Sequence, residues 1–151
     1  MTAKLIDSLI SVDLFLAARR SEEIGPRYSD DELLLAIERY EKFFLLCQRF
    51  PDAPIAPCRD IDDIWHVHML KPVAYYNDCI RLFGYILDHD GGFGATDEEA
   101  PELERVFGAT ATLWEREFGE SYVQGTKGQG MTKCTRNCVS RCQRACKTKT
   151  S

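Results

Sequence analysis

The residues best suited to chemistry are concentrated between Asp60 and Cys79. This stretch, DIDDIWHVHMLKPVAYYNDC, holds two of the three histidines, one of the two tryptophans, two tyrosines and four aspartates. Imidazole, carboxylate and thiolate groups are the side chains that bind transition metals, and a histidine beside a carboxylate can also transfer protons. The stretch therefore predicts a metal site or another polar functional site.

The two histidines of this stretch, His66 and His68, are separated by one residue. In an extended strand such a pair faces one side and can bind one ion together. In a helix the two side chains lie about 200° apart. Because the surrounding pattern predicts a helix, we expect the two imidazoles to point to different faces and to serve different contacts.

Other pairs in the stretch do share a helix face. Asp62 and Asp63 precede His66 by four and three residues, so either carboxylate is expected to orient this imidazole or to pair with it. A returning chain is expected to bring further ligands close, and these are Asp78, Cys79 and His89. We expect His89 to lie near a helix C-terminus, where the helix dipole favours the imidazolium.

A purely structural role is the alternative for the same stretch. Trp65, Ile64 and Met69 would then belong to the core. His66 or His68 would be a buried histidine hydrogen-bonded to an aspartate or to a tyrosine hydroxyl. The sequence alone leaves the structural, metal-binding and catalytic interpretations open.

A second cluster of potential ligands lies near the C-terminus, where four cysteines recur at every fourth position: Cys134, Cys138, Cys142 and Cys146. On a helix this spacing gives one slowly drifting stripe of thiols. Such a stripe suits a soft metal ion, copper(I) or zinc, or an iron–sulfur cluster. S-acylation beside a membrane surface and a basic tail with reactive thiols are the alternatives.

Charge divides the chain in the same place. Seven of the 19 basic residues lie in residues 127–151, which contain no acid, so residues 1–126 carry 12 basic and 24 acidic residues. We expect a helical body over residues 1–124 and a linker with a Cys-rich basic tail over residues 125–151. The tail would suit a membrane surface or an acidic protein partner. It lacks aromatic residues that stack on bases, so nucleic acid is not the expected partner.

Hydrophobic periodicity predicts an all-α fold, a compact bundle of about five helices with a flexible tail. Helices are expected over residues 2–19, 30–50, 61–70, 72–87 and 97–118. Capping boxes begin at Ser29 and Thr96, and Pro72 suits a first helical turn. No membrane-spanning apolar run and no secretory leader are evident, so we expect a cytoplasmic protein with reduced cysteines.

The central stretch resembles one known family. A D-x-x-W-H-x-H core from Asp62 to His68 is followed by Pro72, Tyr75 or Tyr76, Asp78-Cys79, Phe83-Gly84 and His89-Asp90. This arrangement resembles the glycine-rich domain-containing-protein-like family over about residues 30–118. The resemblance implies that a common set of residues acts together, namely Trp65, His66, His68, Tyr76, Asp78 and Cys79. The family has no well-established activity, and its plant members with a putative RNA-binding module differ from this chain in their C-terminal regions.

These observations favour a non-catalytic binding protein whose tail carries soft-metal or thiol chemistry. The first alternative is a metal-dependent or acid–base enzyme that uses His66 with Asp62 or Asp63. The second is an adaptor whose basic tail contacts a membrane or an acidic partner. The sequence lacks a Gly-rich phosphate loop, a nucleophile elbow and a His-Glu-x-x-His motif, which counts against the corresponding hydrolases and nucleotide-binding proteins.

Overall fold

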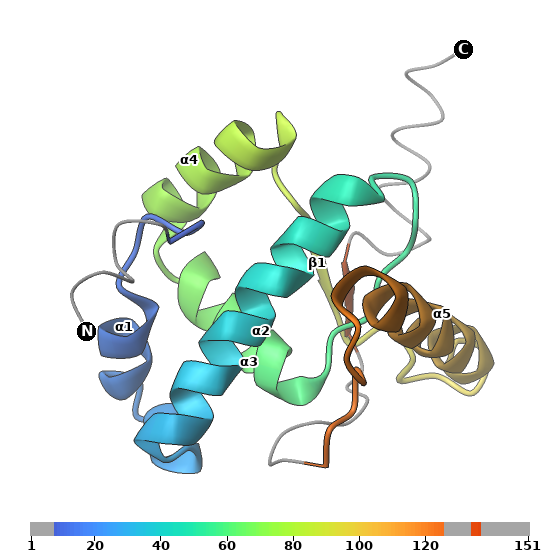
Figure 1. The fold of residues 1–151 in the computed structure, drawn as a ribbon, viewed down its shortest axis with the longest axis horizontal. Coiled ribbons are helices and arrows are strands. Elements are labelled where there is room, and N and C mark those ends of the chain that lie inside the picture. The colour runs from blue at the N-terminus through green and yellow to red at the C-terminus, as the bar shows by residue number, and fades with distance from the viewer. Residues whose placement is uncertain (1–7, 126–133, 137–151) are drawn as a thin grey trace.

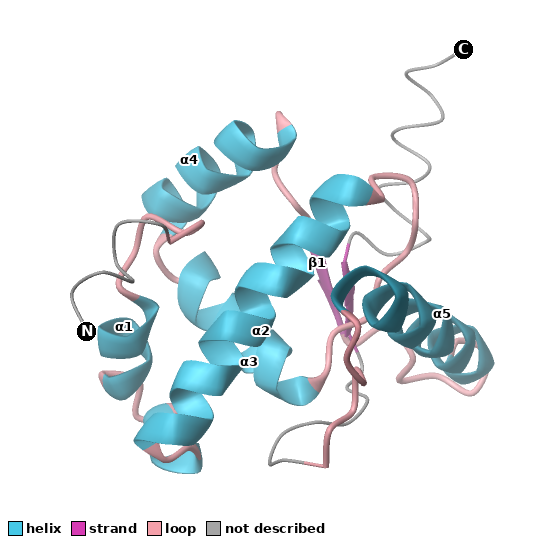
Figure 2. Ribbon diagram, in the orientation of Figure 1, coloured by secondary structure: helices cyan, strands magenta, loops and turns pink. Residues whose placement is uncertain are grey.

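Helices dominate the computed structural model, which describes residues 8–125 and 134–136 (Figures 1 and 2). Its elements in chain order are α1 (Leu14–Arg19), a short 3₁₀ turn η2 (Gly25–Arg27), α2 (Asp30–Arg49), α3 (Arg59–Met69), α4 (Pro72–Phe83), β1 (His89–Gly91), α5 (Ala100–Phe118) and β2 (Cys134–Arg136). The predicted all-α class is confirmed. The sequence pattern did not predict the small antiparallel pair formed by β1 and β2.

The long helix α2 begins where its capping box predicts. The Ser29 hydroxyl accepts a hydrogen bond from the Glu32 N–H, and the Glu32 carboxylate accepts one from the Ser29 N–H. Both donors would otherwise lack intrahelical partners. The helix ends before Pro51, and its buried face, which includes Tyr40 and Phe44, packs across α3. This crossing forms the centre of the core (Figure 1).

Helix α4 begins at Pro72, as predicted, but ends earlier than the apolar pattern indicated. Gly84 follows the helix with φ of 79°, a left-handed conformation that glycine adopts without steric cost. The prediction of a helix to residue 87 was therefore wrong, and Leu87 lies in an extended segment. His89 consequently stands in β1 and not at a helix C-terminus, which corrects the expected environment of this imidazole.

The first helix is also shorter than predicted. Residues 8–13 are not helical, and α1 begins at Leu14 because the Asp13 side chain accepts a hydrogen bond from the Leu16 N–H. Upstream of this cap, Ser11 hydrogen-bonds to Asp78 through both its N–H and its hydroxyl. The residues before Ser8 lie outside the described part of the chain.

Before α5, the predicted capping box is only half formed. The Thr96 hydroxyl accepts a hydrogen bond from the Glu99 N–H, but the Glu99 carboxylate accepts from the Gly94 N–H, and the helix begins at Ala100. The helices within residues 8–125 are all too short or too polar to cross a lipid bilayer.

The predicted division between body and tail at residue 125 stays a prediction. Of the four tail cysteines, Cys138, Cys142 and Cys146 lie outside the described residues. Cys134 is the first residue of β2, where its backbone is paired with Gly91. The second strand therefore lies directly beside the strand that carries His89 (Figure 2).

Candidate metal centre

Helix α3 directs its polar side chains to several different partners. Asp60, in the first turn, forms a buried salt bridge with Arg39 of α2 at 2.8 Å. Asp63 accepts hydrogen bonds from the Tyr28 hydroxyl at 2.6 Å and from the Arg27 guanidinium at 3.0 Å. These two carboxylates hold α3 against neighbouring segments of the fold.

His66 and His68 point to different faces of α3, as the helical period predicts. His68 is fully buried, whereas the side chain of His66 is 45% exposed. The two imidazoles therefore do not bind one ion together, and they belong to two separate clusters.

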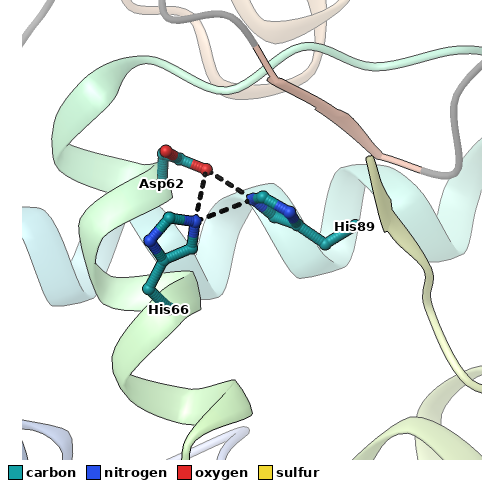
Figure 3. Close-up of side chains that lie close together, drawn as sticks. All are labelled: Asp62, His66 and His89. Atoms are coloured by element: carbon teal, nitrogen blue, oxygen red, sulfur yellow. Dashed lines mark hydrogen bonds and ion pairs between the residues drawn. The ribbon is translucent and has the colours of Figure 1, made fainter. Parts of the chain in front are cut away.

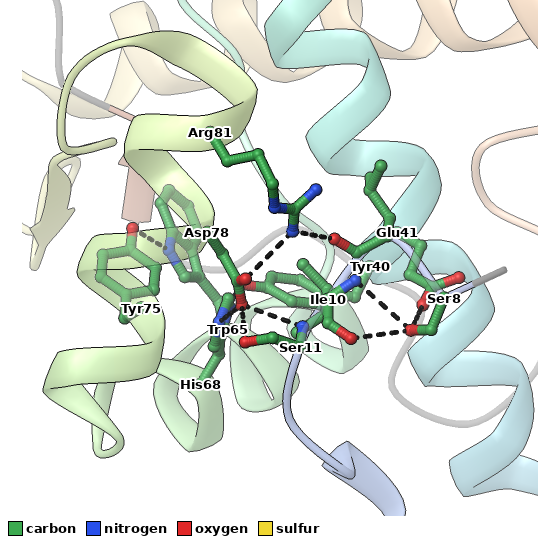
Figure 4. Close-up of polar contacts among 11 residues, drawn as sticks. Ser8, Ile10, Ser11, Tyr40, Glu41, Trp65, His68, Tyr75, Asp78 and Arg81 are labelled. Carbon is green, nitrogen blue, oxygen red and sulfur yellow. Dashed lines mark hydrogen bonds and ion pairs between the residues drawn. The ribbon is translucent and has the colours of Figure 1, made fainter. Parts of the chain in front are cut away.

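The buried cluster is centred on His68. Its Nε2 lies 2.9 Å from Asp78 Oδ2 and its Nδ1 lies 2.7 Å from the Tyr40 hydroxyl (Figure 4). One tautomer satisfies both contacts, with Nε2–H donating to the carboxylate and Nδ1 accepting from the phenol. Burial lowers the pKa of His68, against the opposing effect of Asp78, so the ring is held neutral.

Asp78 connects this cluster to the N-terminal segment. Burial opposes its ionisation, but hydrogen bonds from Ser11, Arg81 and His68 outweigh that effect and lower the pKa of Asp78. The network thus joins the segment before α1 to α2, α3 and α4 (Figure 4). Because His68 and Asp78 are both almost inaccessible to solvent, the cluster suits a structural role and not contact with a substrate.

The second cluster contains Asp62, His66 and His89, and three of their ligand atoms converge (Figure 3). Asp62 Oδ1 lies 2.7 Å from His89 Nε2 and 3.6 Å from His66 Nε2. The two Nε2 atoms are 3.1 Å apart. Asp62 and His66 are brought together by their spacing of four on α3, whereas His89 arrives from β1.

Two kinds of interaction are possible within this triangle of atoms. An imidazole nitrogen that carries a hydrogen cannot also accept one. Hydrogen bonds are one kind, because an Nε2–H of His89 or of His66 can donate to the Asp62 carboxylate. A cation at the centre would instead use a lone pair from each of the three atoms. The three atoms are thus close enough either to share hydrogen bonds or to hold a metal ion together.

His89 is positioned by a chain of contacts through the core. The indole of Trp65 lies edge-on to the His89 ring, with centroids 4.5 Å apart, and its N–H donates to the Tyr75 hydroxyl at 2.9 Å. That hydroxyl donates in turn to the Leu87 carbonyl, two residues before His89. Tyr75 thereby fixes the segment that leads into β1.

The remaining predicted site residues do not join the triangle. Asp63 is held by Arg27 and Tyr28, and Tyr76 is 51% exposed on α4. Cys79 is fully buried, and burial raises the pKa of its thiol, which favours a protonated core residue.

Several residues that shape the two clusters were not predicted from the sequence. These are Ser11, Tyr40 and Tyr75. Tyr75 was considered only as an alternative to Tyr76 in the family pattern. The position of Tyr75 ten residues after Trp65 carries no local signal, because the hydrogen bond between them depends on how α4 packs on α3.

The comparisons place this arrangement in a family. The model of the glycine-rich domain-containing protein-like family matches residues 4–78. The chain belongs to this family. The matched region contains Asp62, His66, His68 and Asp78, and His89 lies beyond its end. The match thus begins and ends earlier than the resemblance over residues 30–118 indicated.

Two relatives from Arabidopsis thaliana are similar to most of this chain. Glycine-rich domain-containing protein 2 is 30% identical, with 84% of this chain and 17% of the relative covered. Glycine-rich domain-containing protein 1 is 35% identical, with 78% of this chain and 15% of the relative covered. The chain therefore spans less than a fifth of the length of either relative. No solved structure matches the chain.

Proposed function

We propose that this protein binds a divalent transition-metal ion, zinc or iron(II), through Asp62, His66 and His89. The observation that supports this is the convergence of one carboxylate oxygen and two imidazole nitrogens, at separations of 2.7, 3.1 and 3.6 Å. Two imidazoles and a carboxylate form a donor set that zinc and non-haem iron both accept.

The size of the triangle also fits such an ion. Ligand atoms at about 2.0–2.1 Å from a tetrahedral metal are about 3.3 Å from one another. The three separations scatter around that value. A triangle with these sides has a circumscribed radius of about 1.9 Å, which is shorter than the metal–nitrogen bond. An ion slightly above the plane of the three atoms would therefore lie about 2 Å from each of them.

The enzyme alternative uses the same residues. The exposed side chain of His66 places the triangle at the protein surface, so further positions of a bound ion would face solvent. A metal-bound water there would be activated for proton transfer or hydrolysis. Of the two carboxylates considered as partners of His66, Asp62 is the one in contact, and Asp63 is occupied elsewhere.

The cysteine tail is a second candidate metal site. One observation favours a role for the tail near the triangle. The backbone of Cys134 in β2 is paired with that of Gly91, two residues after His89. In a reducing cytoplasm, thiolates of Cys134, Cys138, Cys142 and Cys146 would hold copper(I), zinc or an iron–sulfur cluster. An adaptor role, in which the basic tail meets a membrane or an acidic partner, is the alternative for this segment.

Metal analysis of the full-length protein separates the two sites. We expect His66→Ala and His89→Ala each to bind one equivalent less of zinc or cobalt(II) than wild-type protein, because the affinity of the body site falls at least about hundredfold. Asp90→Asn is the matched control, because it removes an acid beside His89 that does not belong to the triangle.

A variant with all four tail cysteines replaced by serine completes the experiment. The number of metal ions bound per chain should fall, relative to wild type, only by the number that the tail binds. Circular dichroism of each variant should match wild type, so that lost binding is not lost folding. Full retention of the metal in both histidine variants would refute the body site.

A further inference from the structure

An apolar pocket adjoins the metal triangle. It has a volume of about 330 Å³, at the low end of the range for small-molecule sites. Its walls come from the α3–α4 junction at Met69 and Pro72, from Tyr75 and Tyr76 of α4, and from residues 86–89. Most of these side chains are apolar or aromatic, so the pocket favours a molecule with a hydrocarbon or aromatic body.

Two features connect the pocket to the triangle. His89 belongs to both, because it is one of the residues that line the pocket and its Nε2 meets Asp62 and His66. Along α3, Asp62, His66 and Met69 are spaced by four and three residues and therefore share one face. A molecule in the pocket would thus lie beside an ion held by the triangle.

The surroundings of the pocket indicate the character of such a molecule. Its rim carries exposed apolar side chains, with Tyr76 and Ile86 each 51% exposed and the nearby Val73 74% exposed. Exposed apolar groups gathered at one place commonly mark a binding site. The acidic residue in the wall, Asp88, and the excess of acids in residues 1–126 disfavour an anion.

We propose that this pocket binds a neutral, mainly apolar small molecule that coordinates the metal through an oxygen donor at one end. The inference rests on the proposed metal site, and adds the pocket as the part that selects the ligand. The apolar walls would hold the body of the molecule, and His89 would bring the metal to its polar end.

A pair of hydroxamic acids that differ only in chain length tests the proposal. Both are neutral in solution near pH 7, and each releases its N–OH proton to the buffer when its two oxygen atoms bind the metal. With cobalt(II)-loaded full-length protein, the cobalt absorption spectrum reports coordination directly. We expect octanohydroxamic acid to bind at least about tenfold more tightly than acetohydroxamic acid, because its methylene groups leave water for the pocket.

Two isoleucine variants assign the difference to the pocket. Ile86→Asp places a charge in the pocket wall and should reduce binding of the longer compound at least about fivefold, with acetohydroxamic acid unaffected. Ile80→Asp is the matched control, because Ile80 is 40% exposed on α4 and does not line the pocket. It should leave both affinities at the wild-type value.

The outcomes separate this inference from the proposed function. If cobalt(II) binds in a manner that His66→Ala and His89→Ala abolish, and the two compounds have equal affinity, the pocket proposal is wrong and the metal site stands. If isothermal titration shows that the longer compound binds equally well to metal-free protein, the pocket is independent of the metal and the proposal is again wrong. If cobalt(II) does not bind at all, both the proposed function and this inference are wrong.

Discussion

Replacement of Asp60 by asparagine should destabilise the protein more than any exposed charge change. Asp60 and Arg39 form a salt bridge whose side chains are 3% and 0% exposed. Without the carboxylate charge, the Arg39 guanidinium stays buried against the rings of Trp114 and Tyr122, at 5.2 and 5.5 Å from their centroids. The cation–π contacts with these rings offset only part of the free-energy cost of the buried, unpaired charge.

The magnitude follows from the burial of both partners. Removal of one partner of a buried ion pair costs about 3–5 kcal/mol, and asparagine keeps a hydrogen-bond acceptor, so we expect about 3 kcal/mol. For a chain of this size, that corresponds to a fall in the melting temperature of about 6–12 °C.

Urea unfolding followed by circular dichroism measures the loss, by linear extrapolation of the free energy of unfolding. Glu102→Gln, which removes the partner of the exposed Arg105, is the control and should leave the midpoint unchanged. The double change Arg39→Met with Asp60→Leu should regain most of the stability, because it removes the uncompensated charge. A loss below about 1 kcal/mol in Asp60→Asn, or a double variant as unstable as the single one, would contradict this explanation.

Two further predictions concern the clusters around α3. Burial lowers the pKa of His68. Below about pH 6.5 the unfolded chain therefore takes up a proton that the folded chain does not. The free energy of unfolding consequently falls as the pH decreases towards the folded-state pKa. His68→Gln keeps hydrogen-bond partners for Tyr40 and Asp78 but cannot titrate. Its urea midpoint should therefore depend less on pH between 6.5 and 5 than that of wild type. Parallel curves for the two proteins would argue against His68 as the source of the pH dependence. Tyr75→Phe removes the hydroxyl that fixes the segment before β1, and isothermal titration should show zinc affinity reduced about tenfold, against no change for the exposed Tyr76→Phe.

Local features of the fold were predictable because their causes lie within a few residues. The capping box at Ser29 and Glu32 satisfies backbone donors of the same helical turn. Pro72 lacks an N–H that the first helical turn does not use. The apolar pattern after Phe83 predicted a helix that ran too far, although glycine at position 84 is itself a local signal for helix termination.

The choice among neighbouring acids was not predictable in this way. Asp62 and Asp63 are both within helical reach of His66, and their spacing does not separate them. Asp63 instead accepts hydrogen bonds from Tyr28 and Arg27, which are more than 30 residues away in sequence, and so does not contact His66. Asp62 is then the carboxylate that faces His66, because α3 turns that side of the helix towards β1.

The sequence by itself determined that His66 and His68 would diverge, because the helical period sets the angle between residues two apart. The same period put both Asp62 and Asp63 within reach of His66, and the sequence did not choose between them. Only the tertiary structure decided that His89 completes the triangle, because the end of α4 at Gly84 and the contacts of Tyr75 carry the chain back to α3. The stretch from Asp60 to Cys79 thus supplies two of the three proposed ligands, and chain packing supplies the third.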